Sequence, residues 1–130
     1  MALEPVLRYV ILAEDWEQSH PHRNRINILG LLSSVDLPLP FPAFVPEMCC
    51  VVMLTECRGS GSVAIQCVFE ETGRRVFGTQ TREAPLGNDP LDIVIVPFRI
   101  LECFFPSPGT YNIQFLFDGK VLGECPLRVR

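Results

Sequence analysis

Three carboxylates and two imidazoles lie within nine consecutive residues of this chain. They are Glu14, Asp15, Glu17, His20 and His22. Both kinds of group bind divalent transition metals. Pro21 restricts the backbone between the histidines, however, and the spacing matches no known metal motif. A metal or small-ligand site in the loop Glu14–His22, with Asp15, His20 and His22 as ligands, is therefore one hypothesis.

The same stretch has a structural interpretation, which we favour. Residues 14–24 are largely polar, as is typical of a solvated loop, and they include Trp16, the only tryptophan of the chain. A lone tryptophan is commonly mostly buried. We therefore expect Asp15 and Trp16 to form a structural hinge, with the indole covering the end of the folded domain.

Six cysteines raise the question of disulfides or a metal centre, and their spacing argues against both. They are Cys49, Cys50, Cys57, Cys67, Cys103 and Cys125. The only close pair is directly adjacent, and neighbours on a strand point to opposite faces, so the two cannot easily share one ion. We expect the cysteines to be small buried hydrophobic residues, with no metal or other cofactor.

Catalytic motifs are not found in the sequence. Covalent catalysis requires a nucleophile, a base and an orienting group, and the only histidines lie in one loop. The sequence has no Gly-x-Ser-x-Gly elbow, phosphate loop or dinucleotide fingerprint. Glu70 and Glu71 are adjacent in a turn, whereas glycosidase carboxylates face each other. We expect no catalytic residues and a protein that is not an enzyme.

The charge balance argues against nucleic acid as a partner. The formal net charge is -4, and Lys120 is the only lysine, so no basic stripe can follow a phosphate backbone. The densest basic patch consists of Arg74, Arg75 and Arg82, and is typical of a protected sheet edge.

Membrane insertion and export are not expected either. The longest apolar run, Met48–Leu54, is far shorter than the roughly 20 residues of a spanning helix. The first residues show neither a basic leader nor an apolar core before a cleavage site. We expect a cytoplasmic protein without a membrane partner.

Short apolar segments separated by twelve prolines and nine glycines predict an all-β fold in one domain, residues 1–130. Seven to eight strands without helices are most simply buried as a two-sheet antiparallel sandwich. The expected strands are Val6–Ala13, Arg25–Val35, Met48–Cys57, Ser62–Phe69, Arg75–Gln80, Leu91–Val96 with Ile100–Phe104, Thr110–Phe117 and Lys120–Val129. Val6–Ala13 is nearly all apolar, which predicts cover on both faces.

Four prolines within Asp36–Pro46 argue against a central strand there, since proline lacks the ladder donor. Leu39, Phe41 and Phe44 have two interpretations. They could dock in an aromatic groove of a partner, or they could pack over the core edge as the chain crosses between sheets. We favour the second interpretation.

The C-terminal strands form a hairpin, because Asp118–Gly119 separates two alternating runs. Pro108–Tyr111 leads into this hairpin, as at the closing corner of immunoglobulin-like sandwiches. Tyr111 is expected to bond back to nearby backbone there, in a structural role.

Several motifs together resemble a family of short, single-domain, all-β bacterial proteins of unknown function, and the resemblance spans nearly the whole chain. These motifs are Leu12–Asp15, Ile26–Leu31, Phe41–Pro46, Pro108–Tyr111, Phe117–Gly119 and Pro126–Val129. The resemblance implies an immunoglobulin-like sandwich of bacterial or phage-related origin, and no activity or site residue.

The sequence is consistent with two functions. The first is a non-enzymatic interaction or structural module that binds a protein or self-associates through a sheet face or edge, since a terminal strand ending Leu127–Arg130 can add to another sheet. The second is the metal or small-ligand site at Glu14–His22.

Overall fold

The computed structural model describes residues 4–18, 26–36 and 41–130, which form ten strands. No helix occurs in these residues, and hence none that could cross a membrane. The strands are β1 Val6–Gln18, β2 Ile26–Leu31, β3 Ser34–Val35, β4 Ala43–Thr55, β5 Gly59–Phe69, β6 Arg75–Gly78, β7 Arg82–Gly87, β8 Val94–Phe105, β9 Gly109–Phe117 and β10 Lys120–Val129.

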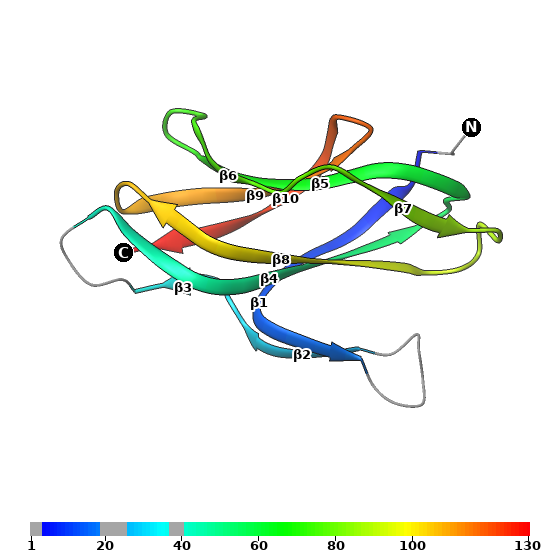
Figure 1. Cartoon of the computed structure of the whole chain (residues 1–130), viewed down its shortest axis with the longest axis horizontal. Coiled ribbons are helices and arrows are strands. Elements are labelled where there is room, and N and C mark those ends of the chain that lie inside the picture. The colour runs from blue at the N-terminus through cyan, green and yellow to red at the C-terminus, as the bar shows by residue number, and fades with distance from the viewer. Residues whose placement is uncertain (1–3, 19–25, 37–40) are drawn as a thin grey trace.

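The strands form two layers (Figure 1). The four-stranded sheet has the order β2-β1-β4-β8, and the six-stranded sheet has the order β3-β10-β9-β5-β6, with β7 also paired to β5. All pairs are antiparallel except β3 with β10. The order β1-β4-β8 facing β10-β9-β5 matches strands A, B, E and G, F, C of an immunoglobulin domain. The predicted two-sheet, immunoglobulin-like sandwich is confirmed.

The chain contains more strands than the seven to eight expected. The predicted strand Arg25–Val35 divides between the two sheets as β2 and β3. Strand β7 occupies a segment outside the expected strands, and it contains Pro85. Among the described strands, β7 pairs with β5 alone, so it is an edge strand, where proline is tolerated.

Proline also falls within β4, contrary to expectation. Strand β4 starts at Ala43 and contains Pro46, although it is a central strand. The last pair of β1 with β4 joins Ala13 to Cys49. Before Cys49, therefore, β4 pairs with β8 alone, and this part of it is an edge where proline is tolerated.

The segment after Ala13 is a strand and not the predicted loop. Strand β1 continues to Gln18 and pairs with β2, matching Trp16 with Ile28. We call residues 14–18 with 26–31 the β1–β2 arm. Gly30 of β2 has a φ of 69°, and a Cβ there would meet Cδ of Glu14 at 2.7 Å. Only glycine suits both conditions.

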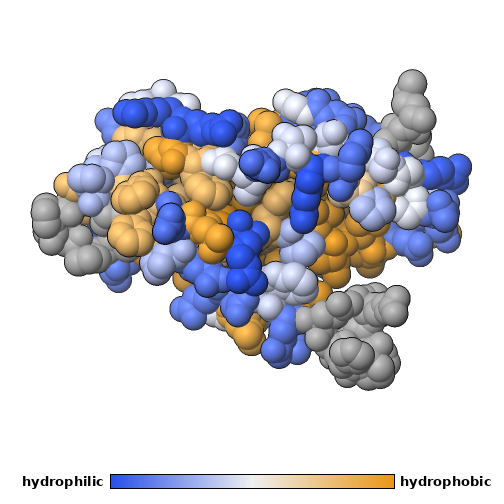
Figure 2. All heavy atoms as spheres, in the orientation of Figure 1, coloured by the Kyte–Doolittle hydropathy of each residue, from blue (hydrophilic) through white to orange (hydrophobic). Residues whose placement is uncertain are grey.

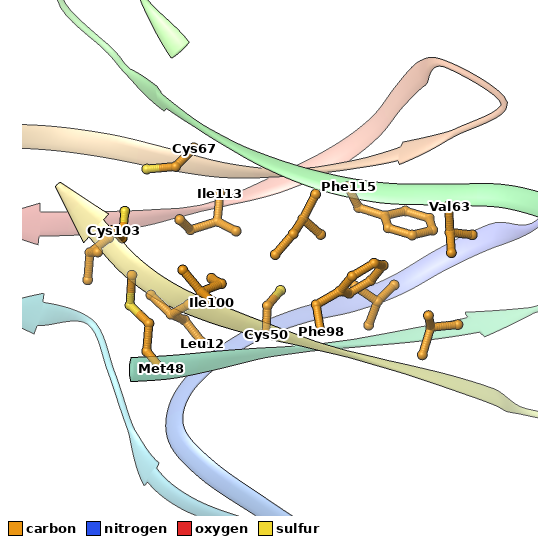
Figure 3. Packing of buried hydrophobic residues seen from close by; sticks show 14 of the residues in the cluster. Leu12, Met48, Cys50, Val63, Cys67, Phe98, Ile100, Cys103, Ile113 and Phe115 are labelled. Carbon is orange, nitrogen blue, oxygen red and sulfur yellow. The ribbon is translucent and has the colours of Figure 1, made fainter. Parts of the chain in front are cut away.

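The space between the sheets is filled by alternating side chains (Figure 3). Ile113 and Phe115 of β9 and Val63 and Cys67 of β5 point inward as their alternation predicts. They meet side chains of the other sheet, and Phe98 packs edge-on against Phe115 with ring centroids 6.2 Å apart. This apolar contact between layers is the main stabilising term of such a fold.

The C-terminal hairpin is fixed at both ends. The Asp118–Gly119 turn has φ values of 50° and 82°, as a type I′ turn requires. The carboxylate of Asp118 accepts a hydrogen bond from the amide of Ser62 at 3.0 Å, and the amide of Asp118 donates to the Ser62 carbonyl at 2.8 Å. The turn is thereby fastened to β5.

At the opposite end, the hydroxyl of Tyr111 donates to the carbonyl of Ser107 at 2.7 Å. Its ring is fully buried between Phe69 and Phe105, with centroid distances of 4.8 and 4.9 Å. This is the back-bond of an immunoglobulin tyrosine corner.

Removal of this hydroxyl tests the corner. We expect Tyr111→Phe to lower the free energy of unfolding by about 1 kcal/mol or more, because the hydrogen bond is buried. The control is Tyr9→Phe, since Tyr9 is the other tyrosine and is exposed. Denaturant titration measures both, and equal stability of the two variants would show that the bond does not support the fold.

Candidate functional site

The four-stranded sheet is apolar on both faces. Strand β4 buries Cys50 and Val52 in the main core, and Cys49 and Val51 on the opposite, outer face. Two rows of paired apolar residues cross this outer face. The first row consists of Tyr9, Met53 and Ile95. The adjacent row consists of Ile11, Val51 and Pro97. An antiparallel sheet with one solvated face would carry polar residues at these positions.

The outer face of the six-stranded sheet follows that polar pattern at its centre. The side chain amide of Gln66 donates to Gln114 across β5 and β9 at 2.8 Å. Next along the strands, Asn112 donates to the Glu70 carboxylate at 3.3 Å. The apolar outer surface is thus a property of one sheet and not of the whole molecule.

The β1–β2 arm covers part of the apolar outer face. Trp16, Ile26 and Ile28 pack against a cluster formed by Ala13, Cys49 and Val51. Trp16 was expected to cover the end of the sandwich, and this expectation was wrong in position. Ala13 and Trp16 pack in the same cluster, although they are three positions apart and a regular strand would point them to opposite faces, so the alternation of β1 breaks at Glu14–Asp15. The break brings the arm against the face.

Beyond the arm, apolar side chains remain uncovered. Leu91 is 88% exposed, and Tyr9 and Ile93 are each 60% exposed. Leu91 and Ile93, together with Met53 and Ile95, line a cavity of about 710 Å³. We call Tyr9, Met53, Leu91, Ile93 and Ile95 the open apolar surface. Figure 2 shows apolar residues exposed right of centre, where Figure 1 places the end of β4 and the start of β8.

A smaller aromatic pair lies at the far end of the same sheet. Phe44 and Phe104 are about half exposed, with ring centroids 5.1 Å apart. Glu102, with a φ of 54°, breaks the alternation of β8 so that Leu101 and Phe104 are both exposed. Phe41 packs against the core, and Leu39 lies outside the described residues. Of the two described residues, Phe41 thus fits the favoured interpretation of packing at the core edge, and Phe44 is exposed.

The predicted metal ligands are only partly described. Asp15 accepts a hydrogen bond from the amide of Trp16 at 2.8 Å, and Glu17 lies beside Asn27 at 3.4 Å. His20 and His22 lie outside the described residues. Within residues 4–18, 26–36 and 41–130, no three His, Cys, Asp or Glu residues cluster as a metal site. A site that uses the histidines stays a prediction.

All six cysteines are free, and five of them are buried. Cys49 and Cys50 lie on opposite faces of β4, as the strand period predicts. Burial raises the pKa of the Cys49 and Cys50 thiols, and it raises the pKa of Cys125 to about 11. The thiol of Cys103 hydrogen-bonds to that of Cys67 and, with burial, raises the pKa of Cys67. The thiols with raised pKa, those of Cys49, Cys50, Cys67 and Cys125, are protonated at neutral pH and are therefore poor nucleophiles.

The predicted free terminal strand is not free at its end. The amide of Arg128 donates to the Ser33 carbonyl, and that of Arg130 donates to Val35, each at 3.0 Å. Strand β3 thus pairs with the end of β10. Addition of a partner strand at Leu127–Arg130 was a wrong expectation, because the chain supplies that strand itself.

One cation of the predicted basic patch joins the two sheets at an edge. Arg82 of β7 donates to the carbonyl of Pro97 in β8, and its guanidinium lies 5.0 Å from the centre of the Phe98 ring.

Pro97 is tolerated in β8 because this strand is the edge of its sheet.

A family model of unknown function matches residues 8–130 of this chain. The chain belongs to the DUF6941 family. The resemblance to a family of all-β proteins of unknown function is confirmed, and this DUF6941 chain matches no curated protein.

Among solved structures, two likenesses concern proteins of Pseudomonas. An immunoglobulin-like protein of Pseudomonas aeruginosa is 14% identical, with a TM-score of 0.36, over 95% of this chain and 98% of that chain. The DNA glycosylase AlkC of Pseudomonas fluorescens, bound to DNA with an abasic-site analogue, is 13% identical, with a TM-score of 0.49. That match covers 75% of this DUF6941 chain and only 27% of the glycosylase chain. The immunoglobulin-like assignment rests on the strand order and the Tyr111 corner.

A change at Trp16 tests whether the arm covers the outer face. We expect Trp16→Ala to cost roughly 1–2 kcal/mol of stability, less than a fully buried tryptophan, because the indole is half-buried. The variant should also bind more of a hydrophobic fluorescent dye than the wild type, since Cys49 and Val51 become accessible. Leu31→Ala, at an exposed position of the same arm, is the control. Wild-type dye binding by the Trp16 variant would contradict the cover.

Proposed function

We propose that this DUF6941 protein is a non-enzymatic interaction module that binds a partner protein through the open apolar surface. One observation carries the proposal: the four-stranded sheet exposes Tyr9, Leu91 and Ile93 next to a cavity lined by Met53 and Ile95. Contiguous exposed apolar patches on folded proteins mark interaction sites.

Burial of this surface by a partner would contribute favourable free energy to binding. Complete burial of a leucine or isoleucine side chain contributes about 1.5–3 kcal/mol. A few such residues dominate the energy of most interfaces, and tyrosine is enriched among them. Leu91, Ile93 and Tyr9 are the most exposed members of the surface, so they have the most to gain from burial by a partner.

The state of the thiols supports a binding role over a catalytic one. The cysteines are the strongest nucleophiles of the chain. Burial raises the pKa of Cys49 and Cys50, and the hydrogen bond with Cys103 together with burial raises the pKa of Cys67, so these thiols stay protonated. Six free cysteines also suit a reducing compartment. A cytoplasmic location is therefore part of the proposal.

Site-specific photo-crosslinking tests the proposed surface. A photoreactive phenylalanine analogue at Ile93 should cross-link one discrete protein in the cells that make this chain. The same analogue at Glu124, an exposed position on the outer face of the six-stranded sheet, should not. The captured protein, once purified, should bind the wild type, and Leu91→Ser with Ile93→Ser should weaken its affinity at least tenfold, since each substitution removes an apolar contact.

Three results would contradict the proposal. They are equal cross-linking from both positions, unchanged affinity for the double serine variant, and a cross-linked product that consists of two copies of this chain. Both serine substitutions fall at exposed positions, where changes usually alter stability by about 0.5 kcal/mol or less. Circular dichroism of the variants checks that loss of binding is not loss of fold.

A further inference from the structure

Charge is divided unevenly between the two sheets. The strands of the four-stranded sheet contain two cations and five carboxylates, namely Arg8, Arg99, Glu14, Asp15, Glu17, Glu47 and Glu102. The strands of the six-stranded sheet contain four cations and two carboxylates, namely Arg75, Arg82, Lys120, Arg128, Glu83 and Glu124. The sheet that exposes the open apolar surface is therefore the acidic one.

Both cations of the acidic sheet already have carboxylate partners. Arg8 lies 3.3 Å from the Glu56 carboxylate and also donates to the Thr55 hydroxyl at 2.7 Å. Arg99 pairs with Glu47 of the adjacent strand. These pairs leave the excess carboxylates of the sheet uncompensated within the described part of the chain.

Two further carboxylates lie at the open apolar surface itself. Asp92 lines the cavity together with Leu91 and Ile93. Asp89 is held beside them, because its carboxylate accepts the amide of Leu91 at 2.9 Å and its carbonyl accepts the amide of Asp92 at 3.0 Å. Neither forms an ion pair with another described residue. One edge of the open apolar surface, the loop before β8, thus carries two carboxylates.

From this charge pattern we infer that the partner docks a cationic apolar segment, in which lysine or arginine flanks the apolar side chains. The inference rests on the proposed function and specifies its partner. A neutral apolar segment would remove water from Asp92 without replacing its hydrogen bonds, which is costly. A nearby cation offsets that cost and speeds association.

A second copy of this chain fits the surface less well. Each copy has a formal charge of -4, and a two-fold interface apposes the same patch of both copies. Such an interface would bring two acidic borders together, and like charges across an interface are unfavourable. The structure therefore favours a different protein that carries the opposite charge.

Matched peptides test the inference. One probe is a short peptide that alternates phenylalanine with serine and has lysines at both ends, and the second has glutamates in place of the lysines. At low salt the lysine peptide should bind at least tenfold more tightly and shift the methyl signals of Leu91 and Ile93. At high salt the difference should shrink several-fold, because exposed charges are screened.

Removal of one border charge provides the matched variant. Asp92→Asn should weaken the lysine peptide roughly threefold, as expected for an exposed ion pair, whereas Glu124→Gln on the other sheet should leave its affinity unchanged. Equal binding of both peptides at Leu91 and Ile93 would overturn the charge inference and leave the proposed function standing. Binding of neither peptide, or burial of the open apolar surface in a dimer, would overturn the inference, and cross-linking at Ile93 then decides the proposed function separately.

Discussion

Strand β4 is apolar on both of its faces, and the rest of the structure depends on this constraint. Val52 and its inward neighbours need cover from the six-stranded sheet, and Val51 needs cover on the opposite side. A sandwich supplies only the first cover. The β1–β2 arm supplies the second over part of the face, and apolar side chains beyond it are exposed. The proposed function depends on the part of the outer face of the four-stranded sheet that the arm does not cover.

Local breaks in strand alternation control which apolar residues are covered. At Glu14 and Gly30 the alternation of the arm changes, and Trp16 thereby turns toward Val51. At Glu102 the positive φ changes the alternation of β8, and Phe104 faces solvent while Cys103 and Phe105 stay buried. Left-handed conformations of non-glycine residues are costly and concentrate at functional sites. The break at Glu14 and Gly30 thus accompanies the patch that Trp16 covers, and the break at Glu102 accompanies the exposed ring of Phe104.

The sequence predicts what depends on local pattern. The Asp118–Gly119 hairpin, the Tyr111 corner and the inward alternation of β5 and β9 all follow from turn residues and period two. Proline signals failed at Pro46 and Pro97, because only the tertiary pairing shows which part of a strand is an edge. The sequence does not predict the β1–β2 arm, because the carboxylates at its start, Glu14, Asp15 and Glu17, are typical of a solvated loop. A signal for the open surface was present, since Ile93 and Ile95 alternate with residues that are equally apolar.

Methyl relaxation by a soluble paramagnetic gadolinium chelate measures the central claim most directly, since it reports how close solvent comes to each side chain. The outward methyl groups of Val51 should be protected as well as the inward ones of Val52, whereas those of Leu91 and Ile93 should relax strongly. Rapid relaxation at Val51 would show that the arm does not cover the face. Protection at Leu91 and Ile93 in the isolated protein would show that no open apolar surface exists.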